Sequence, residues 1–280
     1  HGVDGDLDDV LLGDAGGTLG SAMAVDLATQ GYKVVLVGRS VDKLKVIEEQ
    51  IKAKGGVCVC LAADVRNLEQ VKALRREVLR IYGRCTVLIN AAGGNQPDAV
   101  TTINRYDPVE LTAENTERGF FNLDMNRFLD VVNVNIMGTV IPCQEFARDM
   151  VEEGGGAIIN FASMNTYRPL SRIPAYALSK AGISNFTQWL AAYLAPAHIR
   201  VNAIAPGFFL NDRSRKLLLT PEGGYSERGG NIIRQTPMGK FGEAEELLGC
   251  MNWLIDDEKA GFVTGITIPV DGGFLSDSGL

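Results

Sequence analysis

Three residues near the middle of the chain have the types and the spacing for acid–base chemistry. Tyr176 and Lys180 lie four residues apart, and Ser163 precedes the tyrosine by thirteen residues. Four residues make about one helical turn, so a helix would place the phenol and the ammonium on one face. A cation beside a phenol lowers the pKa of the phenol, which suits it to proton transfer near neutral pH. A hydroxyl such as that of Ser163 would then hold a substrate oxygen. This spacing alone also occurs on the surface of an ordinary helix. The rest of the sequence must decide between a catalytic site and such a surface.

The bulk composition argues against two classes of partner. The chain has 280 residues, of which 46% are hydrophobic and 22% charged, as in a globular protein with a sizeable core. Its net charge is −7, its pI is near 5.0, and no cluster of Lys and Arg forms a basic stripe, which argues against nucleic acid. No apolar run approaches the roughly 20 residues needed to cross a bilayer. We therefore expect neither a nucleic-acid partner nor a membrane.

Cysteine and histidine usage narrows the chemistry further. The five cysteines are scattered, without a metal-type pair, and are typical of buried thiols in a reducing cytosol: Cys58, Cys60, Cys85, Cys143 and Cys250. Only two histidines occur, which argues against a zinc site and against a Ser-His-Asp hydrolase. The first residues lack the basic and apolar regions of a signal peptide. We expect a cytoplasmic protein without a metal, whose acid–base chemistry comes from Tyr, Lys or carboxylates.

Short apolar runs alternate with longer amphipathic stretches. The predicted strands are 10–12, 33–37, 57–62, 86–89, 157–161, 200–204 and 266–270. The predicted helices are 21–30, 41–54, 68–82, 128–152, 176–194 and 243–254. This rhythm predicts an α/β fold with a Rossmann-type, doubly wound parallel sheet and helices on both faces. No repeat or low-complexity linker interrupts the chain, so we expect residues 1–280 to form a single domain.

Two polar, turn-rich segments break this rhythm, at about residues 94–127 and 208–240. Both follow predicted strands at their carboxyl ends, where open α/β sheets bind ligands. Long segments at such places more often serve function than structure. We therefore expect both to be substrate loops.

The first strand is followed by a glycine-rich turn, Gly13–Gly20. Glycines let the backbone approach a pyrophosphate, and the N-terminus of the following helix offers N–H groups to it. The second strand ends at Arg39, where an acidic residue would bind the ribose 2′-hydroxyl of NAD. An arginine pairs instead with a 2′-phosphate, which favours NADP, with NAD possible.

The chain resembles the short-chain dehydrogenase/reductase family along nearly its whole length, because its motifs follow the order of that family. After the glycine-rich turn come Asp64-Val65, Asn90-Ala91-Ala92-Gly93, Asn135, Ser163, Tyr176, Lys180, Pro206-Gly207 and Asp271-Gly272-Gly273. The resemblance implies a catalytic tetrad of Asn135, Ser163, Tyr176 and Lys180. The cofactor-binding residues that it implies are Gly13, Gly17, Leu19, Gly20, Arg39, Asp64, Val65, Asn90, Ala91, Gly93, Tyr176, Lys180, Pro206 and Gly207. It also implies a homotetramer, with contacts through the late helices and the C-terminal strand.

The glycine-rich turn departs from that family's Thr-Gly-x-x-x-Gly-x-Gly pattern. Counted back from Gly20, the turn has Gly13 in place of the threonine, Asp14 in place of the first glycine and Thr18 in place of the middle one. A carboxylate repels a pyrophosphate, and it needs more room than a glycine does. Either the Asp14 side chain turns away or the affinity for the cofactor falls.

A narrower resemblance points to the branch of the family that contains D-mannonate oxidoreductase, or fructuronate reductase. It rests on four stretches: 93–102, 163–169, 205–209 and 236–242. It implies oxidation or reduction of a secondary alcohol on a sugar acid, a ligand that needs amide partners and a cation for its carboxylate. The substrate candidates are Asn95, Asn165 and Arg168, with Gln96, Arg172 and Arg213 as further partners. The alternatives are a related gluconate, ketose or polyol dehydrogenase, and a non-catalytic dinucleotide-binding sensor or scaffold.

Overall fold

The computed structural model describes residues 9–277, except for the side chains of residues 212 and 213. Within this range, seven parallel strands form one sheet in the order β3-β2-β1-β4-β5-β6-β7. The strands are β1 (Asp9–Gly13), β2 (Lys33–Gly38), β3 (Val57–Ala62), β4 (Val87–Asn90), β5 (Gly156–Phe161), β6 (Ile199–Pro206) and β7 (Thr267–Val270). The predicted doubly wound parallel sheet is confirmed.

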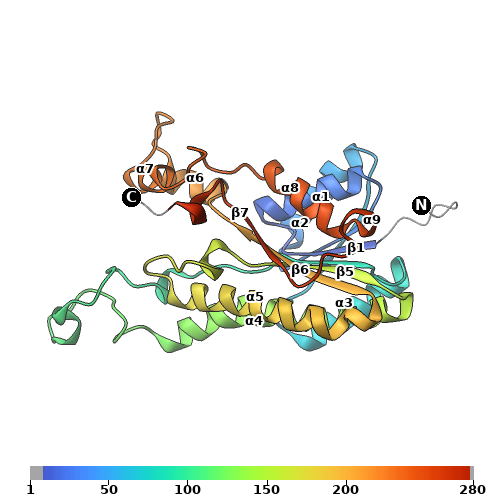
Figure 1. Cartoon of the computed structure of the whole chain (residues 1–280), viewed down its shortest axis with the longest axis horizontal. Helices are drawn as coiled ribbons and strands as arrows, with labels where there is room; N and C mark the ends of the chain where they lie inside the picture. The colour runs from blue at the N-terminus through green and yellow to red at the C-terminus, as the bar shows by residue number, and fades with distance from the viewer. Residues whose placement is uncertain (1–8, 278–280) are drawn as a thin grey trace.

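Helices cover both faces of this sheet (Figure 1). One face carries α3 (Leu68–Ile81), α4 (Met125–Glu153) and α5 (Pro174–Leu194). The other carries α1 (Thr18–Thr29), α2 (Val41–Ala53), α8 (Glu245–Ile255) and the short α9 (Asp257–Ala260). The 3-10 turns are η1 (Pro97–Ala99), η2 (Pro108–Leu111), η3 (Met164–Thr166), η4 (Ala195–Ala197) and η5 (Phe274–Ser276). No helix in the described part is long and apolar enough to span a membrane.

The strand residues divide between two apolar cores because successive side chains point to opposite faces. In β1, Leu11 packs into the core under α3, α4 and α5, whereas Val10 and Leu12 pack under α1, α2 and α8. Both faces of the sheet are therefore shielded from water, which explains why the strand sequences are nearly continuous apolar runs.

The two helices that carry three of the four predicted tetrad residues are fixed at their ends by local sequence. The Asp124 side chain accepts hydrogen bonds from the first turn of α4, and Gly154 ends that helix in a left-handed conformation. Pro174 stands in the first turn of α5, where its missing N–H costs nothing. This places Asn135 in the middle of α4 and Tyr176 near the start of α5.

The segment 208–240 is more regular than the sequence predicted. It contains α6 (Asp212–Leu218) and α7 (Glu227–Arg234), which lie near the C-terminus of the chain in Figure 1. Asn211 and Ser226 cap these helices, since their side chains accept from the backbone N–H groups of Ser214 and Gly229. The segment 94–124 instead leaves the body as an arm between β4 and α4.

Candidate active site

Ser163 follows the carboxyl end of β5, where it begins the η3 turn. Its backbone is extended, and its side chain is only 5% exposed. The Oγ atom accepts from the backbone N of Asn165 at 3.2 Å and from the Nδ2 atom of Asn165 at 3.1 Å. The Ser163 hydroxyl is therefore held rigidly at the edge of the sheet.

Tyr176 and Lys180 lie one turn apart on α5, as their spacing predicts. The Nζ atom of Lys180 lies 5.5 Å from the centroid of the Tyr176 ring, and the side chain of Ser163 is near enough to lower the pKa of Tyr176. Lys180 is buried and donates through Nζ to the Phe161 carbonyl at 2.7 Å. Serine, tyrosine and lysine thus meet at the carboxyl end of β5.

The charge state of this group corrects one prediction. We expected Lys180 to lower the pKa of Tyr176. Burial instead raises the pKa of Tyr176, and only the hydrogen bond from Ser163 lowers it. Burial also lowers the pKa of Lys180 to about 8. The physical reason is desolvation, which disfavours both the phenolate and the ammonium when neither touches a group of opposite charge.

Asn135 lies across from this group, fully buried in α4. Its Nδ2 atom donates to the carbonyls of Gly94 and Val131 at 2.8 Å, and its Oδ1 atom accepts from the Gly94 N at 3.1 Å. A Cβ atom on Gly93 would lie 2.5 Å from this Oδ1 and 3.2 Å from the Nζ of Lys180. Asn135 and Lys180 therefore converge on Gly93, where no side chain larger than hydrogen fits.

A cleft opens where the chain order reverses between β1 and β4, the usual ligand site of a doubly wound sheet. It is lined by Asp14, Gly38, Arg39, Ala63, Asp64, Val65, Arg66, Ala92, Gly93 and Val134. Val65 and Ala92 supply apolar walls, and Asp64 is fixed by an ion pair with Arg66 at 2.6 Å. An apolar slot beside polar groups fits a nucleoside.

The predicted cofactor residues reach this cleft in different ways. Arg39, Asp64, Val65 and Gly93 line it, and Gly17 precedes α1 as its N-terminal cap. Gly20 packs so closely on the turn that a Cβ atom would lie 2.4 Å from the Asp14 carbonyl oxygen.

Asn90 and Pro206-Gly207 do not face this cleft with their side chains. The Asn90 amide is buried and donates to Asn160 Oδ1 at 3.0 Å, so only its backbone is left for the role that we expected. Ala91 packs half-buried against the core under α1, α2 and α8. Gly207 instead lies against Asp271 at the end of β7, where a Cβ atom would approach the Asp271 Cα to 2.6 Å.

A family model for short chain dehydrogenases matches residues 10–220. The chain belongs to this family. The oxidoreductase UxuB of Bacillus subtilis, itself uncharacterized, is 41% identical over 264 residues, which cover 94% of this chain and 93% of that protein.

Two solved structures that are similar to this chain contain bound dinucleotides. A provisionally assigned D-mannonate oxidoreductase from Haemophilus influenzae, with bound NAD, is 41% identical with a TM-score of 0.91, covering 98% of this chain and 96% of that one. A gluconate 5-dehydrogenase from Burkholderia cenocepacia, in complex with NADP and tartrate, is 26% identical with a TM-score of 0.80, covering 97% and 96%. Relatives therefore bind either dinucleotide.

Asp14 is where this short-chain dehydrogenase departs from the family's glycine-rich turn. Its backbone has a φ of 56°, in the left-handed region, and the residue lines the cleft together with Arg39. Although the residue as a whole is exposed, burial of its carboxyl raises the pKa of Asp14, while the positive charges of Arg39 and Lys43 lower it. The carboxyl thus stays near Arg39, which itself lines the cleft.

The predicted substrate residues are less exposed to a ligand than the sequence suggested. Asn95 is half-buried, and its Oδ1 accepts from the Gln96 N at 3.0 Å. Asn165 is buried against Ser163 and does not project into open space. The tertiary packing of the η3 turn, which residue spacing does not reveal, turns this amide inward.

The predicted cations also have partners within the chain. Arg168 is exposed, stacks 5.8 Å above the Phe274 ring and donates through Nη1 to the Asp277 carbonyl at 3.1 Å. Arg172 donates to Asn104 Oδ1 at 2.6 Å. The side chain of Arg213 lies outside the described part of the chain.

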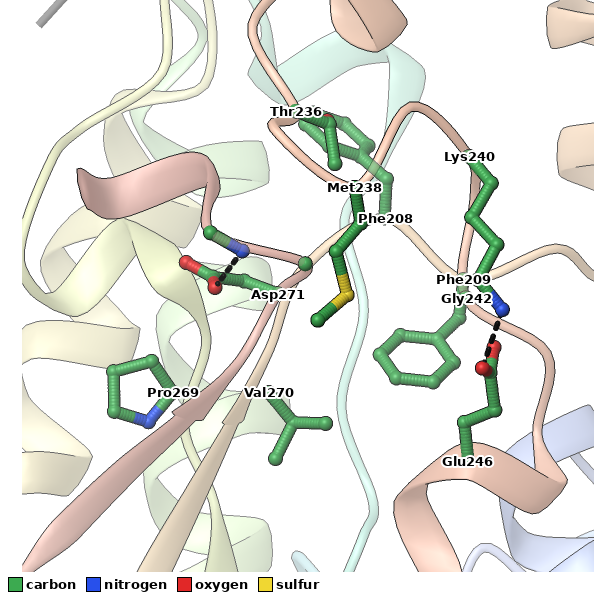
Figure 2. Close-up of a pocket in the computed structure, with 12 residues that line it drawn as sticks. Phe208, Phe209, Thr236, Met238, Lys240, Gly242, Glu246, Pro269, Val270 and Asp271 are labelled. Carbon is green, nitrogen blue, oxygen red and sulfur yellow. Dashed lines mark hydrogen bonds and ion pairs between the residues drawn. The ribbon is translucent and has the colours of Figure 1, made fainter. Parts of the chain in front are cut away.

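A second pocket of about 400 Å³ lies beside the end of β7, and part of its lining comes from the predicted substrate loop at about 208–240 (Figure 2). It is lined by Phe208, Phe209, Thr236, Met238, Lys240, Gly242, Glu246, Pro269, Val270, Asp271, Gly272 and Gly273. Lys240 pairs there with Glu246, and Phe208 packs edge-on against Phe274. Phe208 and Phe209, the apolar residues that follow Pro206-Gly207, are the feature of the sequence that points to this pocket. Among the described residues, no group of three or more metal-ligating side chains occurs.

Proposed function

We propose that this protein interconverts a secondary alcohol and a ketone on a sugar acid, using NAD or NADP, and that D-mannonate and D-fructuronate are its substrate pair. The observation that carries the proposal is the position of buried Lys180 against the Tyr176 ring, with Ser163 near enough to lower the pKa of the tyrosine. A proton relay of this kind has no use in a protein that only binds a dinucleotide.

Each residue of the tetrad has one task in this proposal. When bound, the nicotinamide supplies or accepts a hydride at carbon. Tyr176 donates a proton to the oxygen as the C5 ketone of fructuronate becomes an alcohol, and Ser163 donates a hydrogen bond to that oxygen as negative charge builds. Lys180 supplies positive charge beneath the Tyr176 ring. Asn135 fixes the Gly93-Gly94 backbone beside Lys180 and helps to link the lysine to solvent.

The cleft residues would hold the cofactor. Val65 and Asp64 border the adenine, Arg39 and Asp14 flank the adenosine ribose, and the turn before α1 receives the pyrophosphate. The packing of Gly207 on Asp271 shapes the nicotinamide end. Arg39 favours NADP, whereas the carboxylate of Asp14 opposes a 2′-phosphate in the same cleft.

The sugar-acid assignment is supported by the relatives and by the available polar groups. The gluconate 5-dehydrogenase neighbour holds tartrate, a hydroxy acid. Arg168 stands five residues after Ser163, and its contact with Asp277 uses few of the five N–H donors of a guanidinium. We propose Arg168 as the partner of the substrate carboxylate, with Asn95 contacting the hydroxyls.

The assay that tests this function measures oxidation of NADH or NADPH by the purified protein. The substrates are D-fructuronate, a keto-gluconate, a ketose and an oxidised polyol, each followed by identification of the product. Turnover of D-fructuronate to D-mannonate with the highest kcat/KM is the expected result. A higher value with a neutral sugar or polyol would transfer the assignment to a related dehydrogenase. Dinucleotide binding without turnover of any substrate would favour the sensor or scaffold.

We also propose a cytoplasmic homotetramer. All five cysteines are free thiols. On α5, the exposed rings of Trp189 and Tyr193 stack with centroids 5.1 Å apart, and β7 lies at the edge of the sheet. Exposed aromatic residues on a helix face and an open sheet edge are typical of contacts between subunits. Light scattering on the purified protein tests the assembly.

A further inference from the structure

Asn165 makes two hydrogen bonds to Ser163, which a residue that only binds substrate would not need. Asn165 lies two residues after Ser163 in the η3 turn and is only 4% exposed. Its backbone N and its side-chain Nδ2 lie 3.2 Å and 3.1 Å from the Oγ atom of Ser163. One residue therefore directs two N–H groups at a single hydroxyl oxygen.

The orientation of the Asn165 amide is fixed by a third contact. Its Oδ1 atom lies 2.9 Å from the backbone N of Leu170. A backbone N–H only donates, so the oxygen of the amide must face Leu170 and the NH2 group must face Ser163. A flipped amide would set donor against donor at Leu170 and would turn an acceptor, not a donor, toward Ser163.

These contacts decide what the serine hydroxyl can do. A hydroxyl carries one hydrogen and two acceptor sites, and Asn165 occupies both acceptor sites of Ser163 Oγ. The hydrogen must then be donated away from Asn165. Tyr176 is a group within its reach, since the side chain of Ser163 lowers the pKa of that tyrosine.

We propose that Asn165 is a positioning residue that makes Ser163 an obligatory hydrogen-bond donor toward the reacting oxygen. The inference rests on the proposed function, since it gives Asn165 a task inside the same site. It replaces the contact with substrate that we expected of this residue from the sequence.

The energetic consequence falls mainly on the transition state. Hydrogen bonds in a chain polarise one another, so two donors on Oγ make the Ser163 hydrogen a stronger donor. A stronger donor gains most where the substrate oxygen develops negative charge. Loss of Asn165 should therefore lower kcat far more than it raises KM.

The decisive experiment is a double-mutant cycle between Asn165 and Ser163. Asn165→Ala should lower kcat about tenfold, the equivalent of one hydrogen bond of about 1.4 kcal/mol, with KM nearly unchanged. Asn165→Asp should cost more, because a carboxylate oxygen facing Ser163 accepts its hydrogen. In a Ser163→Ala background, Asn165→Ala should cost nothing further, since the residue acts through the serine. Additive losses, or a rise in KM alone, would overturn the proposal in favour of direct substrate contact.

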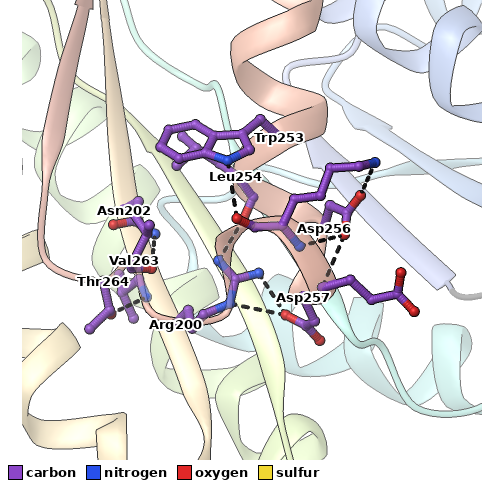
Figure 3. A network of polar contacts seen from close by, with 11 residues as sticks. Arg200, Asn202, Trp253, Leu254, Asp256, Asp257, Val263 and Thr264 are labelled. Atoms are coloured by element: carbon purple, nitrogen blue, oxygen red, sulfur yellow. Dashed lines mark hydrogen bonds and ion pairs between the residues drawn. The ribbon is translucent and has the colours of Figure 1, made fainter.

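Asn202 provides the matched control (Figure 3). It is also a fully buried asparagine with two backbone partners, donating to the Val263 carbonyl at 2.9 Å and accepting from the Ile266 N at 3.2 Å. Asn202→Ala should lower the midpoint of thermal unfolding and leave kcat of the folded protein near wild type. An equal fall in kcat for both alanine variants would reduce Asn165 to general packing.

A second measurement does not need turnover. Tyrosine labelled with ¹³C at Cζ reports the titration of Tyr176 by NMR, with its signal assigned from Tyr176→Phe. The Ser163 hydrogen bond lowers the pKa of Tyr176, and the charged group beside the ring is Lys180 on the same helix. Asn165→Asp should raise the Tyr176 pKa, and uncharged Asn165→Ala should raise it less. If the Tyr176 titration is unchanged in both variants, the proposed role of Asn165 is wrong, even if no substrate is found. If the wild-type protein shows no turnover, only the proposed function is wrong.

Discussion

The ammonium of Lys180 lies beneath the ring of Tyr176, with Nζ 5.5 Å from the ring centroid, and is anchored at 2.7 Å to the carbonyl of Phe161. The anchor comes from the last residue of β5, so the sheet itself fixes where the positive charge stands. The helix and the strand together therefore set the distance between the ammonium and the phenol ring.

Removing the Tyr176 hydroxyl should separate chemistry from binding. Tyr176→Phe keeps the ring but loses the proton donor, so kcat should fall by roughly 10²- to 10⁴-fold, the usual contribution of a general acid. The affinity for the dinucleotide, measured by calorimetry, should stay near that of the wild type.

Tyr167→Phe is the matched control for this prediction. Tyr167 is exposed and donates to the Thr267 carbonyl at 2.6 Å, close to the site in sequence but outside the tetrad. The control should keep its turnover. Near-normal turnover by Tyr176→Phe would refute the assigned role.

Lys180 should make the stability of the protein depend on pH in the alkaline range. Burial lowers its pKa in the folded protein to about 8 from an ordinary value of 10.5. Below pH 8 the folded state bears the whole cost of a buried ammonium, and this cost disappears as the pH rises toward 10.5. The free energy of unfolding of wild type, relative to Lys180→Met, should therefore rise over that interval in urea titrations.

Lys45→Met, at an exposed position of α2, controls for the loss of one positive charge. Its difference from wild type should stay constant over the same interval. A constant difference for Lys180→Met as well would contradict the buried ammonium.

The fold was predictable where periodicity carries the signal. The run 57–62 became β3 with the same bounds, because β-branched and apolar residues fit a pleated sheet. The short α6 and α7 were not predicted, since glycine pairs at 223–224 and 229–230 resemble turns. Asn211 and Ser226 cap these helices, but helices this short are stable only when they pack against the rest of the protein. The sequence does not reveal that packing.

The site was predictable where spacing along one helix decides geometry, as with Tyr176 and Lys180. It was not predictable where tertiary packing orients a side chain. Asn90 follows a strand like a ligand-facing residue, yet its amide turns into the sheet toward Asn160. The pKa of Tyr176 likewise depends on burial, which the spacing of residues does not contain.

Gly93 should be essential for the arrangement of the tetrad. A methyl group there would lie 2.5 Å from Asn135 Oδ1 and 3.2 Å from Lys180 Nζ, so one of them must move. Gly93→Ala should lower kcat at least tenfold, since a displacement of about 1 Å at a catalytic group costs up to about a hundredfold. Gly249→Ala in α8 meets no atom within 4 Å and should leave kcat unchanged. Equal activity of the two variants would show that Asn135 and Lys180 tolerate displacement.

Asp14 should set the choice between the two dinucleotides. Its carboxylate shares the cleft with Arg39, so it weakens the attraction of that arginine for a 2′-phosphate. Asp14→Gly also suits the left-handed φ of 56° at this position, and it should tighten NADPH binding by about tenfold more than NADH binding, a difference of about 1.4 kcal/mol. Fluorescence titration with NADPH and NADH measures the ratio of the two dissociation constants. Asp42→Asn, at an exposed position of α2, is a control that should leave this ratio unchanged. Equal tightening of both cofactors would instead place the repulsion at the pyrophosphate, which NAD and NADP share.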